Sequence, residues 1–439
     1  MQRHVGIPSL ALITVALSLT ACSGSTGESE TASDTNDTSD TAGDCSSPQD
    51  VSGNIEADTE WSCDVVLSGI ITVQNNAVLT VKPGVTVYGK SGSALVISQG
   101  SRMEAVGTAE EPIVFTSSQA EGTRNRGDWG GVVFLGNSYT NLDGGTGLAE
   151  GLENNATYGG GASPDNAYSC GTLKYVRVEF AGFELTTDNE LNGITFYSCG
   201  TGTTVDHVQV HMGDDDGIEA FGGSFNMTHL VITGAADDSI DLDQGFAGMI
   251  QWVFIQHDPA DGNYVFEISD QDVNLDALPR TKPKIANVTA IGGMGPKDAG
   301  IKLKEGGAGE FYNMIITGTN NAQVDLTETV TEGLADAGEI VIKNNIFWDN
   351  GKSGTVWQVS EGSSWDLQGF VENTTNGNIF DQDPMLTATT WGSPNIAPRA
   401  GSPALTGTAA PGFEATDYLG AVKDEASDWT LGWTNYAPN

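Results

Sequence analysis

Apolar and polar residues alternate along most of this chain, in short runs that end in glycine, asparagine or aspartate. Early runs of this kind lie at 77–89, 94–107 and 112–117. Alternation with a period of two predicts β-strands, because successive side chains of a strand point to opposite faces. Helical periodicity is almost absent. The pattern therefore predicts an all-β protein built from short strands and turns.

From residue 173 onward the runs align with one another. They are LKYVRVEF (173–180), VDHVQVHM (205–212), MTHLVITG (227–234), IQWVFIQH (250–257), IANVTAIG (285–292) and FYNMIITG (311–318). The third residue of each run follows the previous one by 32, 22, 23, 35 and 26 positions. One strand at each such step is typical of a solenoid, with loop insertions in the longer steps. We expect one apolar row inside the coil and its alternates outside.

This layout resembles the right-handed parallel β-helices of the pectin-lyase type. Asn287, Asn313 and Asn344 are similar to the stacked asparagine ladder of that fold, although three ordinary turn residues are the alternative. A narrower resemblance is to a group of bacterial surface β-helix lipoproteins. It rests on RGDWGGVVFLGNS (126–138), GTLKYVRVEFAGFE (171–184), MGDDDGIEAFGG (212–223) and DWTLGWT (428–434). The resemblance implies a single-stranded solenoid with N- and C-terminal capping segments.

The N-terminus is expected to lie outside the fold. Residues 1–22 have a basic start, an apolar stretch and the ending LTAC, which resembles a lipobox and implies lipidation of Cys22. A plain cleaved secretory signal is the alternative. Residues 23–44 are rich in Ser, Thr, Asp, Glu and Gly, which predicts a disordered tether. Residues 45–383 then form the β-helix, and the Pro- and Trp-rich segment 384–439 is expected to cap its far end.

The cysteine and charge content indicates the compartment of the protein and excludes some partners. Four cysteines remain besides Cys22, and an even number in an exported chain predicts two disulfides. Proximity favours Cys45–Cys63 and Cys170–Cys199, one of three possible connectivities. The chain has 58 acidic and 18 basic residues, a formal net charge of −40. Such a surface repels nucleic acid and anionic lipid head groups, so neither is an expected partner, and we expect a monomer.

The acidic residues are concentrated between residues 213 and 244, which hold eight carboxylates and no Lys or Arg. Three pairs lie 22 positions apart, which equals the step from His207 to His229, and the next step of 23 leads from Asp238 to Asp261. These acids are therefore expected to stack on successive coils. The predicted set is Asp215, Asp216, Glu219, Asp237, Asp238, Asp241 and Asp261.

Stacked carboxylates need a positive charge among them. Parallel strands lie about 4.8 Å apart, and two unit charges about 4 Å apart repel by about 1 kcal/mol even in water. Calcium binds six to eight oxygens in irregular geometry, so the set predicts a calcium site. Zinc is disfavoured because no close His/Cys spacing accompanies the acids. A solvated acidic edge made of turn residues is the alternative.

A basic cluster follows the acids. Its members are Arg280, Lys282, Lys284, Lys297, Lys302 and Lys304. The pattern of AGIKLKE (299–305) matches that of the acidic runs and places Lys302 near the column of Glu219 and Asp241. In calcium-dependent pectate lyases a Lys or Arg abstracts the C5 proton of a uronate, so Lys302 is the candidate catalytic base. Lysines that only balance the acids are the alternative.

Two functions of different classes follow. The first is an exported lipoprotein, anchored in the outer membrane or at the cell surface, whose calcium-binding β-helix binds glycans or has a structural or adhesive role there. The second is a calcium-dependent polysaccharide lyase acting on acidic (uronate) glycans. The expected partners are the membrane, through the lipid anchor, and acidic polysaccharides or surface glycans. The first function requires fewer inferred residues than the second.

Overall fold

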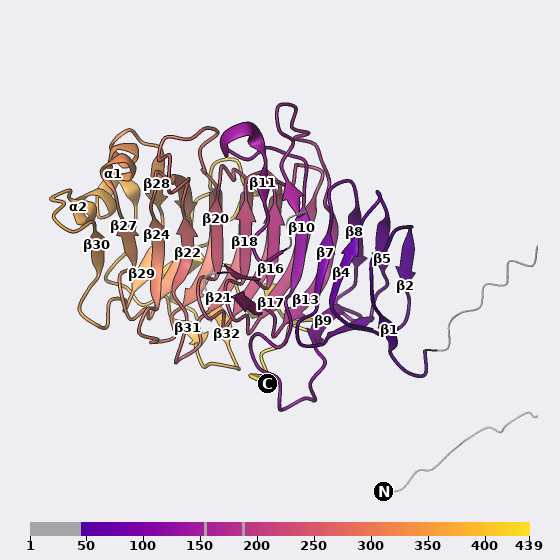
Figure 1. The fold of residues 1–439 in the computed structure, drawn as a ribbon. Coiled ribbons are helices and arrows are strands. Elements are labelled where there is room, and N and C mark those ends of the chain that lie inside the picture. Colours follow the sequence, from indigo (N-terminus) through magenta and orange to yellow (C-terminus); the bar gives the residue numbers. More distant parts are fainter. Residues whose placement is uncertain (1–44, 153–155, 187–188) are drawn as a thin grey trace, which may run out of the picture. The chain divides into compact units, whose positions relative to one another are not determined.

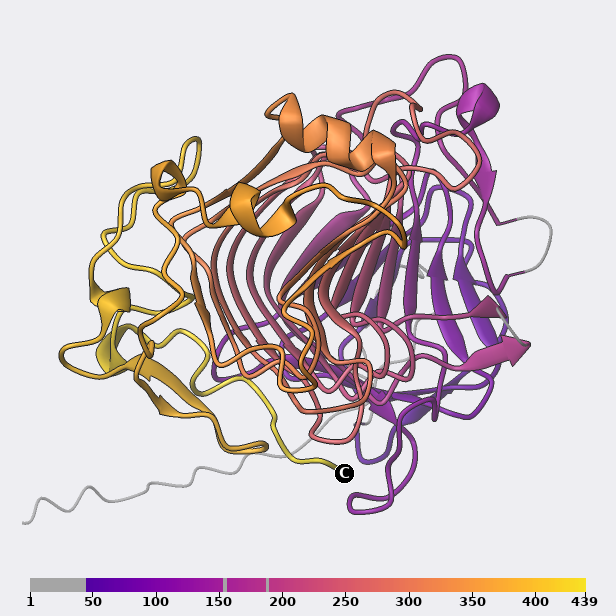
Figure 2. The same cartoon turned by 90° about the vertical axis from the view of Figure 1, so that its left-hand side faces the viewer.

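The computed structural model describes residues 45–152, 156–186 and 189–439. The predicted signal peptide, Cys22 and the predicted tether lie outside these residues. Parallel strands from successive turns of the chain stack side by side from β1 to β30 (Figure 1). The view along the stack shows the coils lying one behind another (Figure 2). This arrangement confirms the predicted all-β, right-handed parallel β-helix.

Two sheets, which we name sheet A and sheet B, form the walls of the coil. Among the described residues sheet A has 16 strands and sheet B has ten. Sheet A contains β1 (Gln49–Val51), β2 (Thr59–Trp61), β3 (Val65–Leu67), β5 (Val78–Val81), β6 (Thr86–Gly89), β8 (Arg102–Val106), β9 (Ile113–Ser117), β13 (Gly171–Glu179), β17 (Thr204–His211), β19 (Asn226–Thr233), β21 (Met249–Gln256), β23 (Lys284–Ile291), β25 (Gly309–Tyr312), β26 (Ile315–Thr317), β28 (Ile340–Lys343) and β29 (Ile346–Trp348). Sheet B contains β4 (Ile70–Val73), β7 (Ala94–Ile97), β10 (Val132–Leu135), β16 (Ile194–Tyr197), β18 (Ile218–Phe221), β20 (Ile240–Asp243), β22 (Tyr264–Ile268), β24 (Ala299–Leu303), β27 (Val324–Leu326) and β30 (Trp357–Val359).

The strand register matches the alignment of the sequence runs. Leu173 pairs with Val205, and the row continues through Met227, Ile250 and Ile285. These residues are buried inside the coil. Because side chains alternate between the two faces of a strand, fixing this one row also fixes which residues face outward.

The third residue of each aligned run lies at a corner of the coil. Tyr175, His207, His229 and Trp252 have φ values between 49° and 59°, so the long strands of sheet A bend there. The four rings stack, with centroids 4.3, 4.2 and 4.8 Å apart. Left-handed backbone is strained for residues other than glycine, and packing along the stack offsets that strain.

The predicted asparagine ladder is only partly realised. Asn287, Asn313 and Asn344 continue the row of corners with positive φ. Their side-chain amides, however, donate to the C-terminal segment, as Asn313 does to the carbonyl of Thr408. Between coils, Asn287 Oδ1 accepts from Gln251 Nε2, and Asn345 Oδ1 accepts from the backbone N–H of Met314.

The remaining elements lie outside sheets A and B. Three two-stranded antiparallel ribbons lie in the described residues: β11 (Gly147–Leu148) with β12 (Thr157–Tyr158), β14 (Glu184–Thr186) with β15 (Asn189–Glu190), and β31 (Leu386–Ala388) with β32 (Asn395–Pro398). The helices there are α1 (Thr329–Asp336), α2 (Leu367–Val371) and the 3₁₀ turns η1 (Asp143–Gly145), η2 (Thr374–Asn376), η3 (Pro403–Leu405) and η4 (Glu425–Ser427). None of these helices is long and apolar enough to cross a bilayer.

The C-terminal segment 384–439 does not cap the end of the coil, contrary to expectation. It runs back along the side of sheet A, as the yellow segment beside the stack shows (Figure 2). Its apolar residues, among them Leu419 and Trp433, pack on outward-facing residues of sheet A such as Val231 and Phe254. The last coil is instead adjoined by α2, whose buried side chains join the main core. The Trp-rich composition of this segment therefore reflects packing against the side of the coil.

Both predicted disulfides are present. Cys45 is bonded to Cys63 in the first coil, and Cys170 is bonded to Cys199 in the middle of the stack. Two disulfides are typical of exported proteins and rare in reducing compartments. The chain is therefore suited to an exported setting.

Candidate functional site

A row of charged side chains runs along the outer face of sheet B. Glu219 pairs in register with Asp241, Asp241 with Glu267, Glu267 with Lys302, and Lys302 with Asp325. Each of these residues is flanked in its strand by buried apolar residues. The alternation that buries the apolar residues therefore places the charged ones outside, one per coil.

Two further carboxylates lie in the turns just before β18 and β20. Asp216 and Asp238 are only 6% and 3% exposed. The Oδ1 atom of Asp216 accepts from the backbone N–H of Asp238 at 2.8 Å, and the Oδ1 atom of Asp238 accepts from that of Tyr264 at 2.6 Å. One oxygen of each carboxylate thus holds the next coil in place, and the turn geometry fixes both side chains.

Together these residues form what we name the acidic cluster. Its members are Asp215, Asp216, Glu219, Asp237, Asp238, Asp241 and Glu267. Three groups of carboxylates in it each have oxygens within 4.8 Å of one another, which is the span of oxygens around one calcium ion. The Oδ1 atom of Asp241 is buried and accepts no hydrogen bond, whereas that of Asp237 lies 3.7 Å from the ammonium of Lys297. A buried acceptor without a partner is costly, and a cation between these oxygens would remove that cost.

The pKa values of the cluster reflect this crowding. Burial, followed by the charge of Asp238, raises the pKa of Asp216 well above its usual range. Burial, followed by the charge of Glu267, does the same for the pKa values of Asp238 and Asp241. The pKa of Glu219 is raised by burial and then by Asp215. The site therefore holds its protons tightly unless a cation stabilises the ionised carboxylates.

Asp261 does not belong to the cluster, and its assignment as a ligand was wrong. Glu219 and Asp241 are 22 residues apart, but Asp241 and Glu267 are 26 apart, because the turn before β22 is longer than the preceding turns. The position equivalent to Asp238 in the next coil is therefore Tyr264. Asp261 instead lies 3.5 Å from the guanidinium of Arg126.

Glu267 is the ligand candidate that the sequence analysis missed. Its signal was present, since VFEIS (265–269) repeats the apolar–acidic–apolar pattern of GIEAF (217–221) and SIDLD (239–243). Glu267 lies outside the dense acidic stretch between 213 and 244, as a lone glutamate. The strand pattern would have been the better guide.

Lys302 of the row and the nearby Lys304 are both engaged with acids. The ammonium of Lys302 lies 2.8 Å from Asp325 Oδ2, and its side chain is 12% exposed. That oxygen also accepts from Tyr264 Oη and Gln358 Nε2. Burial lowers the pKa of Lys304, but Glu267, whose Oε1 lies 2.5 Å from its ammonium, outweighs burial and raises it above the usual range. A general base needs a lowered lysine pKa, so Lys304 is unsuited to that role.

A Ser–His–Asp arrangement begins at Ser239, the residue after Asp238 of the acidic cluster. The Nδ1 atom of His257 donates to Asp298 at 2.6 Å, and its Nε2 atom accepts from the hydroxyl of Ser239 at 3.0 Å. The geometry is that of a nucleophile, base and orienting acid. Ser239, His257 and Asp298 are each no more than 1% exposed, so no substrate reaches the hydroxyl. The three residues come from three successive coils and tie them together.

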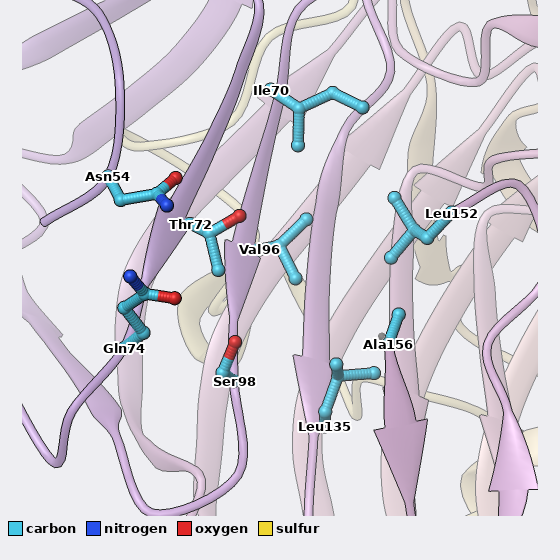
Figure 3. Close-up of a pocket in the computed structure, with 9 residues that line it drawn as sticks. All are labelled: Asn54, Ile70, Thr72, Gln74, Val96, Ser98, Leu135, Leu152 and Ala156. Carbon is cyan, nitrogen blue, oxygen red and sulfur yellow. The ribbon is translucent and has the colours of Figure 1, made fainter. Parts of the chain in front are cut away.

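A groove of about 400 Å³ lies on the N-terminal part of the same sheet face (Figure 3). Thr72, Val96 and Leu135 line it from three neighbouring strands, and Leu152 and Ala156 lie across from them. No ionisable side chain lines this groove in the described part of the chain. The outer face of sheet B thus changes from neutral at its N-terminal end to strongly acidic in the middle.

A family model for the pectate-lyase-like β-helix domain matches residues 53–393. The chain belongs to this family. The match covers every coil that carries the acidic cluster and extends past the end of β31. No curated protein and no solved structure shows significant similarity to this chain. Membership of a pectate-lyase-like β-helix family supports a carbohydrate-related function in general.

Proposed function

We propose that this protein is an exported, lipid-anchored β-helix that binds calcium through the acidic cluster and uses it in glycan binding or adhesion at the cell surface. The anchor rests on the LTAC ending at Cys22, and the exported setting is supported by the two disulfides. The carbohydrate ligand is supported by the β-helix family. The calcium site rests on the geometry of the cluster.

The observation that carries the proposal is a buried oxygen without a hydrogen bond within a crowded set of carboxylates. Asp241 Oδ1 is enclosed by other acids and accepts no hydrogen bond. The donor set consists entirely of carboxylate oxygens, which suits calcium rather than zinc. When bound, calcium neutralises ionised carboxylates and offers its remaining coordination positions to hydroxyl or carboxylate oxygens of a glycan.

Calcium is expected to raise the melting temperature of the protein. An ion that binds only the folded state stabilises it by about 2.7 kcal/mol when its concentration is 100 times the dissociation constant. The double variant Asp216→Asn, Asp238→Asn should lose most of this gain, since it removes two negative charges while keeping one acceptor oxygen on each side chain. Differential scanning calorimetry in calcium and in chelator measures the effect.

The matched control is the double variant Asp276→Asn, Asp417→Asn, which removes two carboxylates of surface ion pairs. It should keep the full calcium response. Equal melting of the wild type in calcium and in chelator would refute the calcium site.

The same samples separate binding from catalysis. The ion pair of Lys302 with Asp325 favours binding, because it engages the amine that a lyase would need free to reach its substrate. We therefore expect no unsaturated products, which absorb in the ultraviolet, from uronate polymers with calcium. Such products, together with their loss in Lys302→Ala, would establish the lyase instead.

A further inference from the structure

Two histidines and an aspartate converge at the corner of sheet A, in neighbouring coils. His207 in β17 and His229 in β19 each follow one residue of a registered pair, Asp206 and Thr228. The two imidazole rings stack with centroids 4.2 Å apart. Ligand atoms of Asp206 and of the two histidines lie within 4.8 Å of one another. Because the histidines are one coil step of 22 residues apart, no local sequence motif reveals this arrangement.

The carboxylate at this corner is crowded with hydrogen-bond partners. Asp206 Oδ1 lies 2.7 Å from Nδ1 of His207 and 2.9 Å from Nδ1 of His229. It also accepts from the hydroxyl of Thr228 at 3.1 Å, so three groups compete for the lone pairs of one oxygen. Burial raises the pKa of Asp206, but hydrogen bonds, first from His207 and then from His229, outweigh burial and hold that pKa below its usual range. An ionised carboxylate therefore faces two imidazole nitrogens.

Two imidazoles and a carboxylate suit zinc better than calcium. Zinc takes three protein ligands and one open position at distances of about 2.0–2.2 Å, whereas calcium takes oxygen ligands alone. Ligand atoms around a tetrahedral zinc ion lie about 3.3 Å apart. The two nitrogen–oxygen distances here must therefore open by a few tenths of an ångström. The two nitrogens, within 4.8 Å of each other, must close by at most about 1.5 Å, which a tilt of the stacked rings can supply.

A hollow beside Asp206 gives an ion access to the corner. It has a volume of about 280 Å³ and is lined by Asp206 together with hydroxyl and amide side chains, among them Thr203, Asn226 and Thr228. The side chains of the two histidines are 13% and 23% exposed. The corner is thus partly shielded from solvent but open to a small ion, as a metal site needs an entry path.

One positive charge opposes a cation at this corner. The ammonium of Lys174 lies 3.0 Å from Asp206 Oδ2, the oxygen that faces away from the hydrogen bonds of the two rings. The side chain of Lys174 is 42% exposed, so it can move into solvent when the carboxylate takes a metal. Lys174 therefore lowers the affinity of the corner for a cation without blocking it.

From these observations we infer that Asp206, His207 and His229 form a zinc site. The site lies on sheet A, is separate from the acidic cluster on sheet B, and does not depend on the proposed calcium-binding function. Zinc bound there joins two neighbouring coils. Trp429 of the C-terminal segment packs edge-on against both histidine rings, so the ion also steadies the surface on which that segment lies.

A zinc titration of the full-length protein in excess calcium tests the inference. Isothermal titration calorimetry should show one zinc ion that depends on the histidines. His207→Asn and His229→Asn should each weaken its binding by at least about 100-fold, beyond the 10–100-fold that loss of an outer-shell partner costs. Lys174→Met should instead strengthen binding by about tenfold, because it removes a positive charge beside the ligand carboxylate. The control variant Asp276→Asn, Asp417→Asn should bind zinc as the wild type does.

The opposite results overturn the zinc site. Absence of zinc binding in the wild type would do so, and so would an affinity that is unchanged in either histidine variant. If a histidine variant fails to fold, Lys174→Met decides, since it keeps both rings and the carboxylate: zinc binding that is unchanged or weaker there overturns the inference. None of these results bears on calcium-dependent melting, which tests the proposed function separately.

Discussion

At the scale of single residues, Asp216 and Asp238 combine two roles that work against each other. Each accepts a backbone N–H from the next coil, which favours a fixed and ionised carboxylate. Each is also buried among other acids, which raises its pKa and favours the protonated form. A cation resolves the conflict, because it stabilises the ionised form that the coil contacts need.

This conflict predicts an unusual dependence of stability on pH. The pKa values of Asp216, Asp238 and Asp241 are higher in the folded than in the unfolded protein, so the folded state binds more protons above the ordinary Asp pKa. In chelator the free energy of unfolding should therefore fall as pH rises from about 5 to about 8. With saturating calcium the fall should be smaller, because the ion binds the ionised carboxylates. Thermal melts at both pH values, with and without calcium, check this; a calcium gain that is larger at about pH 5 would contradict it.

Residue-level prediction from the sequence succeeded where spacing was regular and failed where it was not. The pairs Glu219 with Asp241 and Asp216 with Asp238 follow one constant step, so the periodicity located them. Asp261 was misplaced because a turn lengthened by a few residues shifts every position after it. The apolar–acidic–apolar pattern of VFEIS (265–269), and not a constant step, marks where the next strand of sheet B lies.

At the scale of elements, the corner residues determine how the long strands of sheet A turn. Asn287 has φ of 56° and donates its side-chain amide to Thr416 and to the carbonyl of Gly420 in the C-terminal segment. Asparagine suits such a corner because it tolerates left-handed backbone better than most residues. The amide contacts add a link between the coil and the segment.

Replacing Asn287 separates these two contributions. Asn287→Gly removes the amide bonds but relieves the backbone, whereas Asn287→Ala removes the bonds and keeps the strain. Asn287→Ala should be the less stable by about 1 kcal/mol, the lower end of the cost of left-handed backbone for a residue with a Cβ. Urea unfolding of both variants measures the difference. Equal stabilities would show that the corner is not strained.

The register of these elements was predictable because the inward positions of each run are apolar at a regular spacing, and a slip by one residue would turn them away from the core. The C-terminal segment has no such repeat. Its composition indicated a role in covering apolar surface, but the surface itself, formed by outward-facing residues of several coils, exists only in the folded molecule. The sequence therefore predicted that the segment covers apolar surface, but it placed that surface at the end of the coil.

At the scale of the whole molecule, the C-terminal segment links coils that are distant in sequence. The guanidinium of Arg177 donates to the carbonyl of Trp433, and Asn313 donates to Thr408. Coils of a solenoid otherwise contact only their neighbours. The segment adds contacts that span many coils, so we expect these coils to unfold together.

Trp433→Ala tests this link. Trp433 is 1% exposed and packs edge-on against the stacked rings of Tyr175 and His207. Its truncation should cost about 3–5 kcal/mol, as for other buried large aromatic residues. The control Leu431→Ala alters a side chain that is 61% exposed and should cost less than about 0.5 kcal/mol. Hydrogen exchange should show faster exchange in β13 and β17 for Trp433→Ala alone; unchanged exchange would contradict the link.

The side-lying segment also gives the order of the chain a consequence for the newly made protein. The outward apolar residues of sheet A, among them Val231, Phe254 and Ile315, are covered by residues that follow the coils in sequence and therefore leave the ribosome and the export machinery after them. Until that segment has folded onto them, the coils present an exposed apolar surface. A chain interrupted near residue 384 would keep that surface bare, and we expect it to be removed by proteases or to aggregate rather than to accumulate beside intact molecules.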